Sequence, residues 1–441
     1  MQLYLLKIRF YTISGRKISE MNNHFFEQKD CGLQAFWSST PQFKTARVSA
    51  HLVLPLTTPE NAALYALVPN MISRATREYP DYTQFGKRLA ELYGASVQPG
   101  VTRVGDNQIL TLAAAGIANP YAFGGEDVQQ ALSEMLESIL FTPLCDENGL
   151  FPEDGFLQEQ RQLLETLDAE YNDKATYAMQ RCVQTMFAGE PAGVLRIGTR
   201  EAILNATREG VKAAWEYAVK HAQICQFTIG DGADDRFAQQ LIKRLGMRDA
   251  VSIETKRHTA SGDVKRVTEE MPVVQSKLVM GFAIGTTPEE RLAAKLMSVV
   301  LGGTPSSKLF MNVREKQSLC YYCAARHDTP KNVMFVQSGV ETKDLDRTEE
   351  AILKELNDMK KGNITDDEIL FAKLAMCNSY NAVADSAASM ETWYLSGMLQ
   401  GKLHTPEEYA ERIMNITKDE IVSAAERVTL DTVYKLKGAA K

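Results

Sequence analysis

The sequence predicts an α+β protein built from two homologous tandem halves. Three observations predict this class. Apolar residues alternate along short stretches, which is typical of strands with one buried face. Apolar residues at helical spacing follow each of these stretches. The whole series then recurs along the chain without strict strand–helix–strand alternation, which favours layered α+β halves.

The clearest repeated unit is a strand, a Thr-Thr-Pro-Glu turn and a helix. Alternating apolar residues precede both copies of the turn, and helical spacing follows both. The turns lie at 57–60 and 286–289, the strands at 48–56 and 278–284, and the helices at 64–72 and 292–300. Thr58 and Thr287 are suited to cap the two helices, with Pro59 and Pro288 at the first helical position.

The later elements keep the same order in both halves. These pairs are the strands 109–116 and 334–339, the helices 131–140 and 351–359, the longer helices near 152–171 and 365–384, and the helix starts at 205–207 and 415–417. The second series is a shortened copy of the first. We therefore expect halves at 21–235 and 271–441, joined by a linker and first strand region at 236–270.

The composition is that of a globular protein with a substantial core. The chain has 441 residues, of which 44% are hydrophobic and 24% charged. Its net charge of -7, with no block of Lys and Arg, gives no electrostatic footprint for nucleic acid. No apolar run approaches the ~18 residues that indicate a membrane span. Seven scattered cysteines are typical of free thiols in a reducing cytosol, so we expect a cytoplasmic protein.

The first twenty residues differ from the sequence that follows. Residues 1–20 are basic and contain no apolar stretch long enough for a secretory signal. Ordinary globular sequence starts soon after Met21. We expect 1–20 to be a loose N-terminal extension or the result of a start codon placed too early, with Met21 as the alternative first residue.

Two adjoining motifs in the second half resemble a known family. Residues 301–310 read L-G-G-T-P-S-S-K-L-F, and residues 313–321 read V-R-E-K-Q-S-L-C-Y. Over about 35–441 the chain resembles the pitrilysin/insulinase family of zinc peptidases, which includes the mitochondrial processing peptidases. The resemblance implies two halves that each contain a mostly antiparallel sheet packed by helices, and a function connected with peptide cleavage.

The family's zinc motif is absent from the corresponding helix. In the family this helix carries H-x-x-E-H, in which two His four apart bind Zn²⁺ and the Glu acts as base. By register, Ala66 and Asn70 occupy the His positions and Pro69 the Glu position. None of the six histidines lie four apart. The third-ligand region is 159–165, with Glu165 the better candidate. We expect no metal ligand and no cofactor in this chain.

The other half of the family's active site is retained. The resemblance implies that Arg314 and Tyr321, in R-x6-Y spacing, contact the substrate and stabilise charge at the scissile carbonyl. A surface arginine and a packed tyrosine are the alternative. Loss of the zinc motif with both residues kept resembles split bacterial members, in which a zinc-less subunit lends them to a zinc-bearing one. Residues 171–181 are similar to zinc-less proteins of the YmfF type.

The resemblance implies a protein that is not catalytic in isolation. We expect a heterodimer with a zinc-bearing relative that contains H-x-x-E-H and supplies the zinc, with peptides or unstructured protein segments as substrates. A structural or peptide-holding protein without a peptidase role is the alternative from another class. An independent enzyme with a different metal geometry is a third interpretation.

Three weaker signals carry alternatives. Cys320 and Cys323 form C-x-x-C at the start of a predicted strand, where residues three apart point to opposite faces, so buried thiols are expected and not a redox pair. Gly302-Gly303 lacks a phosphate-loop motif and is expected to form a tight turn. The strand at 107–114 is either a free edge that pairs with peptide or an interior strand.

Overall fold

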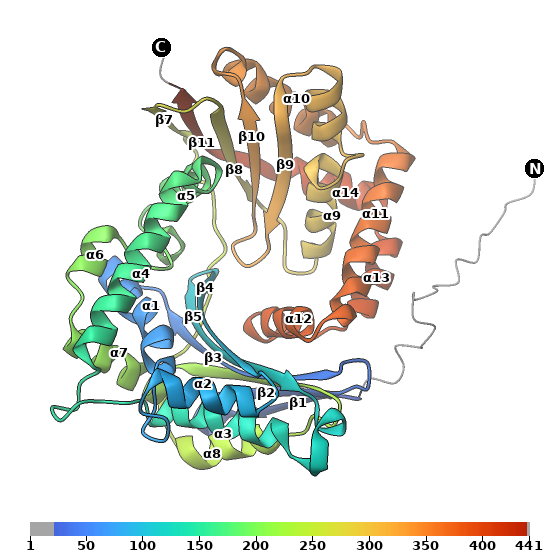
Figure 1. The fold of residues 1–441 in the computed structure, drawn as a ribbon. Coiled ribbons are helices and arrows are strands. Elements are labelled where there is room, and N and C mark those ends of the chain that lie inside the picture. The colour runs from blue at the N-terminus through green and yellow to red at the C-terminus, as the bar shows by residue number, and fades with distance from the viewer. Residues whose placement is uncertain (1–21, 439–441) are drawn as a thin grey trace, which may run out of the picture.

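The computed structural model describes residues 22–438, which form two sheets with helices on the outside of each (Figure 1). The expected N-terminal extension at 1–20 and the alternative start at Met21 lie outside the described residues. The first sheet has the strand order β1-β2-β6-β3-β5-β4, and its neighbours are antiparallel except for the parallel pair β2 and β6. Its strands are β1 (Asn22–Gln28), β2 (Leu33–Ser39), β3 (Thr45–Pro55), β4 (Ser96–Val104), β5 (Asn107–Ile117) and β6 (Gln223–Gly230).

The second sheet repeats this topology. Its order is β7-β11-β8-β10-β9, with one parallel pair, β7 and β11, in the place of β2 and β6. Its strands are β7 (Lys265–Met271), β8 (Ser276–Ile284), β9 (Cys320–Asp328), β10 (Val333–Val340) and β11 (Val428–Gly438). The predicted fold class, α+β with two homologous halves and mostly antiparallel sheets, is confirmed. Only β1 lacks a counterpart among the described residues.

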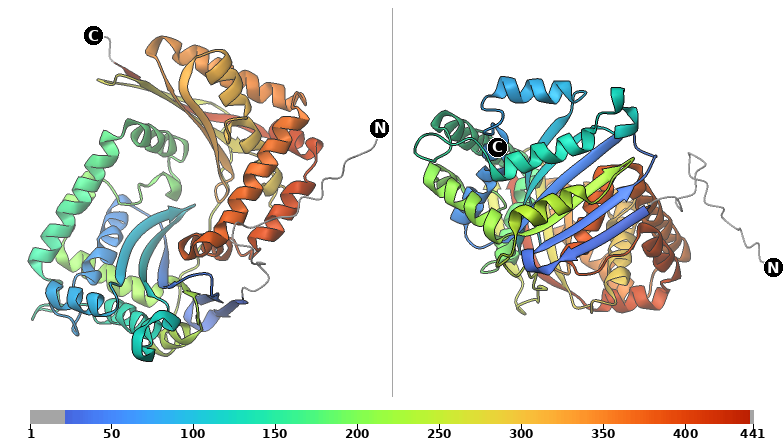
Figure 2. Two further views of the ribbon diagram at one scale, coloured as in Figure 1. Left: turned by 45° about the vertical axis from the view of Figure 1, so that its right-hand side comes forward. Right: turned by 90° about the horizontal axis from the view of Figure 1, so that it is seen from below.

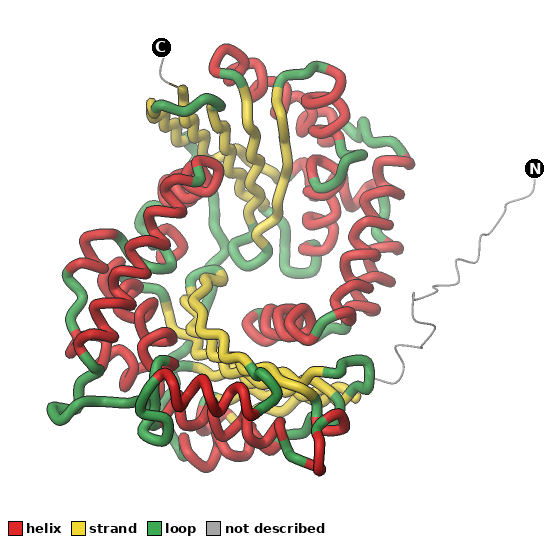
Figure 3. Tube along the Cα trace, viewed as in Figure 1, coloured by secondary structure: helices red, strands yellow, loops and turns green. Residues whose placement is uncertain are grey.

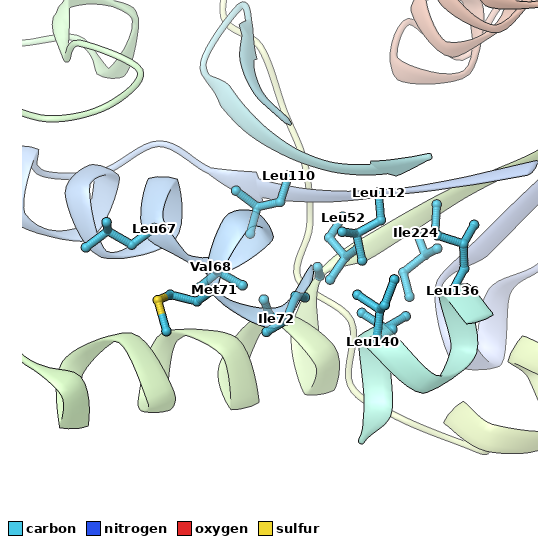
Figure 4. Packing of buried hydrophobic residues seen from close by; sticks show 14 of the residues in the cluster. Leu52, Leu67, Val68, Met71, Ile72, Leu110, Leu112, Leu136, Leu140 and Ile224 are labelled. Atoms are coloured by element: carbon cyan, nitrogen blue, oxygen red, sulfur yellow. The ribbon is translucent and has the colours of Figure 1, made fainter. Parts of the chain in front are cut away.

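The helices of the first half, with the exception of α5, cover the outer face of its sheet. They are α1 (Pro59–Ser73), α2 (Tyr82–Glu91), α3 (Val128–Phe141), α4 (Glu153–Asn172), α5 (Lys174–Met186), α6 (Arg200–Leu204), α7 (Arg208–His221) and α8 (Arg236–Leu245). Figure 4 shows Val68 and Ile72 of α1 on the side of the helix that faces Leu110 and Leu52 of the sheet, all of them buried. Alternation along the strands directs these side chains to one face of the sheet, where they pack against the apolar face of the helix and form one core.

The segment expected to link the halves is partly helical. Helix α8 lies within 236–270, and its buried residues Phe237 and Leu241 pack into the core of the first half. The two residues are four apart, so they share one face of the helix, and that face anchors α8 on the sheet. The chain between the halves is therefore shorter than expected and runs from α8 to β7.

The helices of the second half, with the exception of α12, cover the outer face of the second sheet, as the rotated views in Figure 2 show. They are α9 (Arg291–Gly302), a π-helix (Leu309–Lys316), α10 (Leu345–Lys360), α11 (Asp366–Asn381), α12 (Ala387–Leu399), α13 (Pro406–Asn415) and α14 (Lys418–Glu426). At Gly302, an added Cβ would lie 2.6 Å from the backbone N of Ala325 on β9. Gly302 lets α9 approach the sheet closely, because it has no side chain, and it does not form the tight turn that the sequence predicted.

Each half sends one helix to the inner face of the other half's sheet (Figure 3). Helix α5 packs Cys182 and Met186 against Val279 of β8 and Tyr434 of β11. Helix α12 packs its apolar side chains Met390, Tyr394 and Met398 on the first sheet, against residues that include Phe36, Val53 and Phe227. In Figure 1, α12 lies across the first sheet on the side opposite α2, α3 and α8.

The two Thr-Thr-Pro-Glu turns differ in how they start their helices. Thr58 caps α1, because its side chain accepts a hydrogen bond from the backbone N–H of Asn61. The prediction of the same role for Thr287 is wrong. Its backbone N–H instead donates to Glu290 Oε2 at 2.7 Å, and α9 starts only at Arg291. Arg427 also binds Glu290, so this turn is closed by a contact from far along the chain.

A buried charged cluster holds the halves together near the chain that connects them. Lys331, in the turn between β9 and β10, is fully buried and its Nζ contacts Asp106 at 2.9 Å and Glu190 at 2.8 Å, both from the first half. His258 contacts Glu190 at 2.6 Å and Asp431 at 3.2 Å. Buried charges are tolerated when each has a partner, so this cluster fixes how the hairpin docks on the first half.

None of the helices within residues 22–438 has the length and apolar character that crossing a bilayer requires.

Candidate functional site

Helix α1 carries the three positions at which the sequence analysis places the degenerate zinc motif. Ala66 and Pro69 are buried and Asn70 is partly exposed. Ala66 has only a methyl group, and Pro69 has neither a titratable atom nor a backbone N–H. A proline in a helix interior also removes one hydrogen bond of the helix. These three side chains provide one weak donor, the amide of Asn70, where the family motif provides two imidazoles and a carboxylate.

The carboxylate that faces α1 from α4 is Glu159, and it is already paired with a cation. Arg74, which caps the C-terminal end of α1, donates from Nη1 to Glu159 Oε1 at 2.6 Å and from Nη2 to Gln158 Oε1 at 3.1 Å. The Glu159 side chain is only 6% exposed. At Gly155, one turn earlier on α4, an added Cβ would lie 2.9 Å from Arg74 Nε. Glycine there leaves the room that the guanidinium occupies.

Glu165, the better candidate for a third ligand in the sequence analysis, does not lie on the face of α4 that is directed at α1. Its side chain is 69% exposed and lies 3.8 Å from Arg161 on the surface of α4. Phe156 and Leu163 mark the buried face of this helix, and Glu159 lies between them at helical spacing. That spacing was the signal available in the sequence. Arg74 carried a signal too, because it lies four residues after Asn70 on the same helix.

The residues around α1 do not fit a zinc ion. Zinc sites in proteins use His, Cys or a carboxylate for at least three ligands. Here the side chains of Ala66 and Pro69 have no atom that could bind a metal, and the Glu159 carboxylate forms an ion pair with the guanidinium of Arg74. Within residues 22–438 there is no group of three or more His, Cys, Asp or Glu side chains in a metal-holding arrangement. No step that requires zinc is therefore assigned to this chain.

Arg314 and Tyr321 lie close in the chain and are both solvent-accessible. Arg314 is in the π-helix, 38% exposed, with its guanidinium 4.5 Å from the centre of the Phe310 ring and its Nε 3.5 Å from Glu315. Tyr321 is 59% exposed on β9, at the edge of the second sheet. Besides its contact with the Phe310 ring, Arg314 makes an exposed ion pair with its neighbour Glu315, which is weak in water. Both polar groups are thus available for contacts outside this chain.

A β-bulge at the start of β9 determines where Tyr321 points. Cys320 pairs with Val340 and Tyr322 pairs with Gly339, so Tyr321 is an extra residue in the ladder. The bulge shifts the alternation by one residue, and both Cys320 and Cys323 are buried as a result. The expectation that the two thiols point to opposite faces is therefore wrong, although both are buried as predicted.

The two thiols act on each other's acidity. The neighbouring Cys323 thiol lowers the pKa of Cys320, while the same contact and burial raise the pKa of Cys323. Both residues are free cysteines. Cys320 lies next to Tyr321, so the buried thiols anchor the bulge that exposes the tyrosine.

The strand at this edge of the first sheet is β4 and not β5. Strand β5 pairs with β3 on one side and β4 on the other, so the interior interpretation of 107–114 is correct. Strand β4 ends the sheet order and contains Pro99, which lacks an N–H and is tolerated at edges. Each half therefore has one edge strand in the equivalent place, β4 in the first and β9 in the second.

Comparison with known proteins supports the same family from sequence and from structure. A family model described as the Peptidase M16 inactive domain matches residues 211–376. The "Probable inactive metalloprotease YmfF" of Bacillus subtilis (strain 168) is 28% identical over 422 residues, which cover 93% of this chain and 97% of that protein. The "Uncharacterized zinc protease YmxG" of the same organism is 22% identical over 303 residues, covering 67% of this chain and 71% of that protein.

Solved structures share the fold over nearly the whole chain. A conserved protein from Enterococcus faecalis V583 is 27% identical and gives a TM-score of 0.85, covering 93% of this chain and 97% of that one. A peptidase M16 inactive domain from Pseudomonas fluorescens is 14% identical with a TM-score of 0.76, covering 95% of this chain and 99% of that one. The second likeness concerns the fold alone.

Proposed function

We propose, on the premise that this chain belongs to the M16 family of insulinase-type metallopeptidases and is an inactive homologue within it, that it is the zinc-less subunit of a two-chain peptidase. One observation carries this proposal: the buried carboxylate beside α1 is paired with the guanidinium of Arg74, on a helix with Ala66 and Pro69 in place of ligand and base. A chain with this helix needs a second polypeptide for metal-dependent cleavage.

In the proposed complex, this chain supplies Arg314 and Tyr321. The guanidinium and the phenol hydroxyl are donors, and donors of this kind stabilise the negative charge that develops on a scissile carbonyl. Their exposure supports the role, because a group that serves another chain's active site cannot be consumed by internal contacts. The bulge supports it as well, since it turns Tyr321 outward while its neighbour Cys320 stays buried.

The peptide-binding surface of this chain is proposed to include the edge strand β4. An extended peptide can add to a sheet edge through backbone hydrogen bonds, and alternate side chains then enter pockets on the sheet face. Strand β4 is the edge of the first sheet, and its side chains are partly or fully exposed. The expected substrates are peptides and unstructured protein segments, because only extended chains can pair in this way.

The proposed partner is a relative that contains H-x-x-E-H and brings the zinc and the catalytic base. Bacillus subtilis (strain 168) has both a relative described as an inactive metalloprotease and one described as a zinc protease, and the chain is similar to each. The occurrence of both kinds in one organism supports a pairing of unlike subunits, although neither description mentions a partner.

Co-expression with a zinc-bearing relative from the same host tests the proposal. We expect a stable complex with peptidase activity that neither chain has alone. Arg314→Ala combined with Tyr321→Phe should lower kcat/KM of the complex about 100-fold or more, the effect of losing an oxyanion donor, while the complex still forms. The matched control is Arg161→Ala with Tyr82→Phe, which removes the same groups from exposed positions on α4 and α2. Undiminished activity of the first double variant would remove the donated-pair role.

A peptide-holding or structural role is the second candidate, and one observation favours it. Helix α12 fills part of the inner face of the first sheet with Met390, Tyr394 and Met398, a face that a substrate chamber would leave free. This candidate predicts that affinity isolation from the native host recovers no H-x-x-E-H protein. Recovery of such a protein in equal amount with this chain would decide against it.

A further inference from the structure

Four basic side chains from three separate segments meet where the connecting chain joins the second half. They are Arg257 of the connecting chain, Arg291 and Lys295 of α9, and His327 of β9, and are called here the cationic cluster. Their mutual influence is visible in the histidine: burial, and then the positive charges of Lys295, Arg257 and Arg291, lower the pKa of His327 to about 3. The imidazole is therefore neutral at pH 7 and the two guanidinium groups are cations, while burial lowers the pKa of the Lys295 amine.

Several donors of the cationic cluster are buried and lack any partner. Among residues 22–438, no hydrogen-bond acceptor contacts Arg257 Nε, Arg257 Nη2, Arg291 Nε or His327 Nε2, and all four atoms are inaccessible to solvent. Buried polar groups are almost always hydrogen-bonded, and an unpaired buried cation is the most costly exception. Four such atoms, on three side chains whose charges act on one another, indicate an acceptor that is not part of the described chain.

The contacts that the cationic cluster does make are all to neutral groups. Arg257 donates from Nη1 to the carbonyl of Thr286, and Arg291 donates from Nη1 to Gln400 Oε1 at 3.1 Å. Lys295 Nζ lies 5.0 Å from the centre of the Tyr380 ring. No carboxylate of the described residues forms an ion pair with these three side chains, whereas Lys331 nearby has two.

The remaining groups around the cationic cluster strengthen its preference for an anion. Thr329 Oγ1 lies 3.2 Å from His327 Nδ1; when this hydroxyl donates to Nδ1, the ring proton is on Nε2, which is then a donor. Helix α9 begins at Arg291 without a side-chain cap, so the positive end of its dipole adds to the same region. Two carboxylates, Glu289 and Glu290, act on Arg257 in the opposite direction. Glu289 is exposed, and Arg427 and the Thr287 N–H already hold Glu290.

We propose that the cationic cluster binds a phosphate-class oxyanion that bridges the connecting chain and the second half. Three cations and an imidazole N–H match a multiply charged tetrahedral anion, and guanidinium groups suit its oxygens geometrically. Ordered water would satisfy the same N–H groups, but it would leave their charge uncompensated. The proposal does not rest on a zinc-bearing partner, because the site is formed by this chain alone.

Calorimetric titration of the full chain with inorganic phosphate tests the proposal. Phosphate should bind and raise Tm relative to chloride at equal ionic strength, because a ligand that binds only the folded state stabilises it. Arg291→Gln with Lys295→Met should weaken phosphate binding at least about tenfold, since two of the three charges are gone. Arg326→Gln is the matched control, because Arg326 is exposed on the same strand beside His327 and should leave binding unchanged.

A second titration separates the sources of the anion and guards against misfolding. Tripolyphosphate binding with no binding of free phosphate would support a phosphoryl group carried by a larger molecule, and binding of both would support the free ion. Without phosphate, the double variant should have a Tm at least equal to wild type, because it removes unpaired buried charge; this shows that it folds. Equal affinity of the double variant and wild type, or no binding of either anion to wild type, would overturn the proposal.

Discussion

Helices α5 and α12 occupy equivalent places in the two halves, yet they are attached in different ways. The contact of α5 with the second sheet has a buried apolar part, through Cys182 and Met186, and a partly exposed polar part at Glu269 of β7, where Tyr177 donates at 2.7 Å and Arg181 lies 3.4 Å away. The contact of α12 with the first sheet adds a buried carboxylate, Glu391. Arg47 on β3 holds it with two hydrogen bonds of 2.8 and 2.9 Å. Ser49 donates to the same carboxylate at 2.7 Å, and His51 Nε2 lies 3.2 Å away.

The difference shows that a duplicated framework constrains where a helix lies and not the chemistry that attaches it. An apolar contact depends on area and packing, and its strength changes little with pH. A buried carboxylate bound to cations depends on its ionisation and on the presence of every partner. The titratable group of the α12 attachment, Glu391, is therefore buried, whereas that of the α5 attachment, Glu269, is 29% exposed and reached by water.

The largest expected effect is on the apolar attachment. Phe187, which follows α5, is fully buried and lies edge-on to Phe335 with ring centres 6.3 Å apart. Phe187→Ala should lower the free energy of unfolding by about 3–5 kcal/mol, because it leaves a cavity between the halves. Urea denaturation measures the change. Phe123→Ala is the control, since that ring is 81% exposed, and a similar loss in both variants would contradict the dominance of the apolar contact.

Removal of the ionic attachment comes next. Glu391→Ala leaves Arg47 and His51 buried without their carboxylate and should cost about 3 kcal/mol. Glu407→Ala on α13 is a matched exposed substitution that should change the free energy of unfolding by less than about 0.5 kcal/mol. Chemical denaturation of both variants gives the comparison, and equal stabilities would show that the Glu391 network contributes nothing.

The ionic attachment also predicts a pH dependence. Burial alone raises the pKa of Glu391, but hydrogen bonds and charges from His51 and Arg47 outweigh it and lower the pKa to about 2. Because the folded-state pKa is depressed, the stabilisation is complete above the unfolded value near 4.5 and is lost as the pH falls toward about 2. The stability difference between wild type and Glu391→Gln should therefore shrink below about pH 4.5. A difference that stays constant over this range would disprove the assignment.

A smaller effect is expected at the Arg74–Glu159 pair between α1 and α4. Arg74→Met leaves Glu159 buried without a cation and should cost about 2 kcal/mol. In a Glu159→Gln background the same change should cost less than about 1 kcal/mol, because the amide is uncharged. A double-mutant cycle measures this coupling. Glu165→Gln, on the exposed face of the same helix, serves as control and should show no coupling with Arg74.

The smallest effect is expected at the exposed pair. Arg314→Ala with Tyr321→Phe should change the free energy of unfolding of the isolated chain by less than about 0.5 kcal/mol, because neither polar group makes a buried contact. Thermal unfolding of the purified variant measures it. A large loss of stability would mean that the two residues serve the fold, and a loss of activity in a complex could then not be assigned to them directly.

The local sequence pattern predicted much of the fold, because a strand or helix that buries one face has apolar residues at regular intervals. The alternation before each Thr-Thr-Pro-Glu turn became β3 and β8, and the helical spacing after it became α1 and α9. The cap of α1 was also predictable, since Thr58 acts on its own helix. Thr287 was not, because Glu290 is held by Arg427 from the far end of the half, a contact that no local pattern contains.

The candidate site was predicted in composition more accurately than in geometry. The identities of Ala66, Pro69 and Asn70 follow from register alone. The pairing of Arg74 with Glu159 depends on how α1 and α4 pack, and sequence spacing gives only the buried face of each helix. The exposure of Tyr321 depends on a bulge whose cause lies in the pairing with β10, so alternation counted along β9 gave the wrong face for one thiol.

The exchange of α5 and α12 means that the two halves are interlocked and not merely tethered. Cleavage of the exposed residues 261–263 would produce two fragments. The helix α5 of the first fragment would still pack on the sheet of the second, and α12 of the second would still pack on the sheet of the first. Once assembled, the two fragments should remain associated without a continuous backbone. A fragment made separately would expose the apolar face of its sheet, because the helix that covers this face is part of the other fragment. The continuous backbone would then be needed for the two halves to assemble, and the contacts of α5 and α12 would keep them together afterwards.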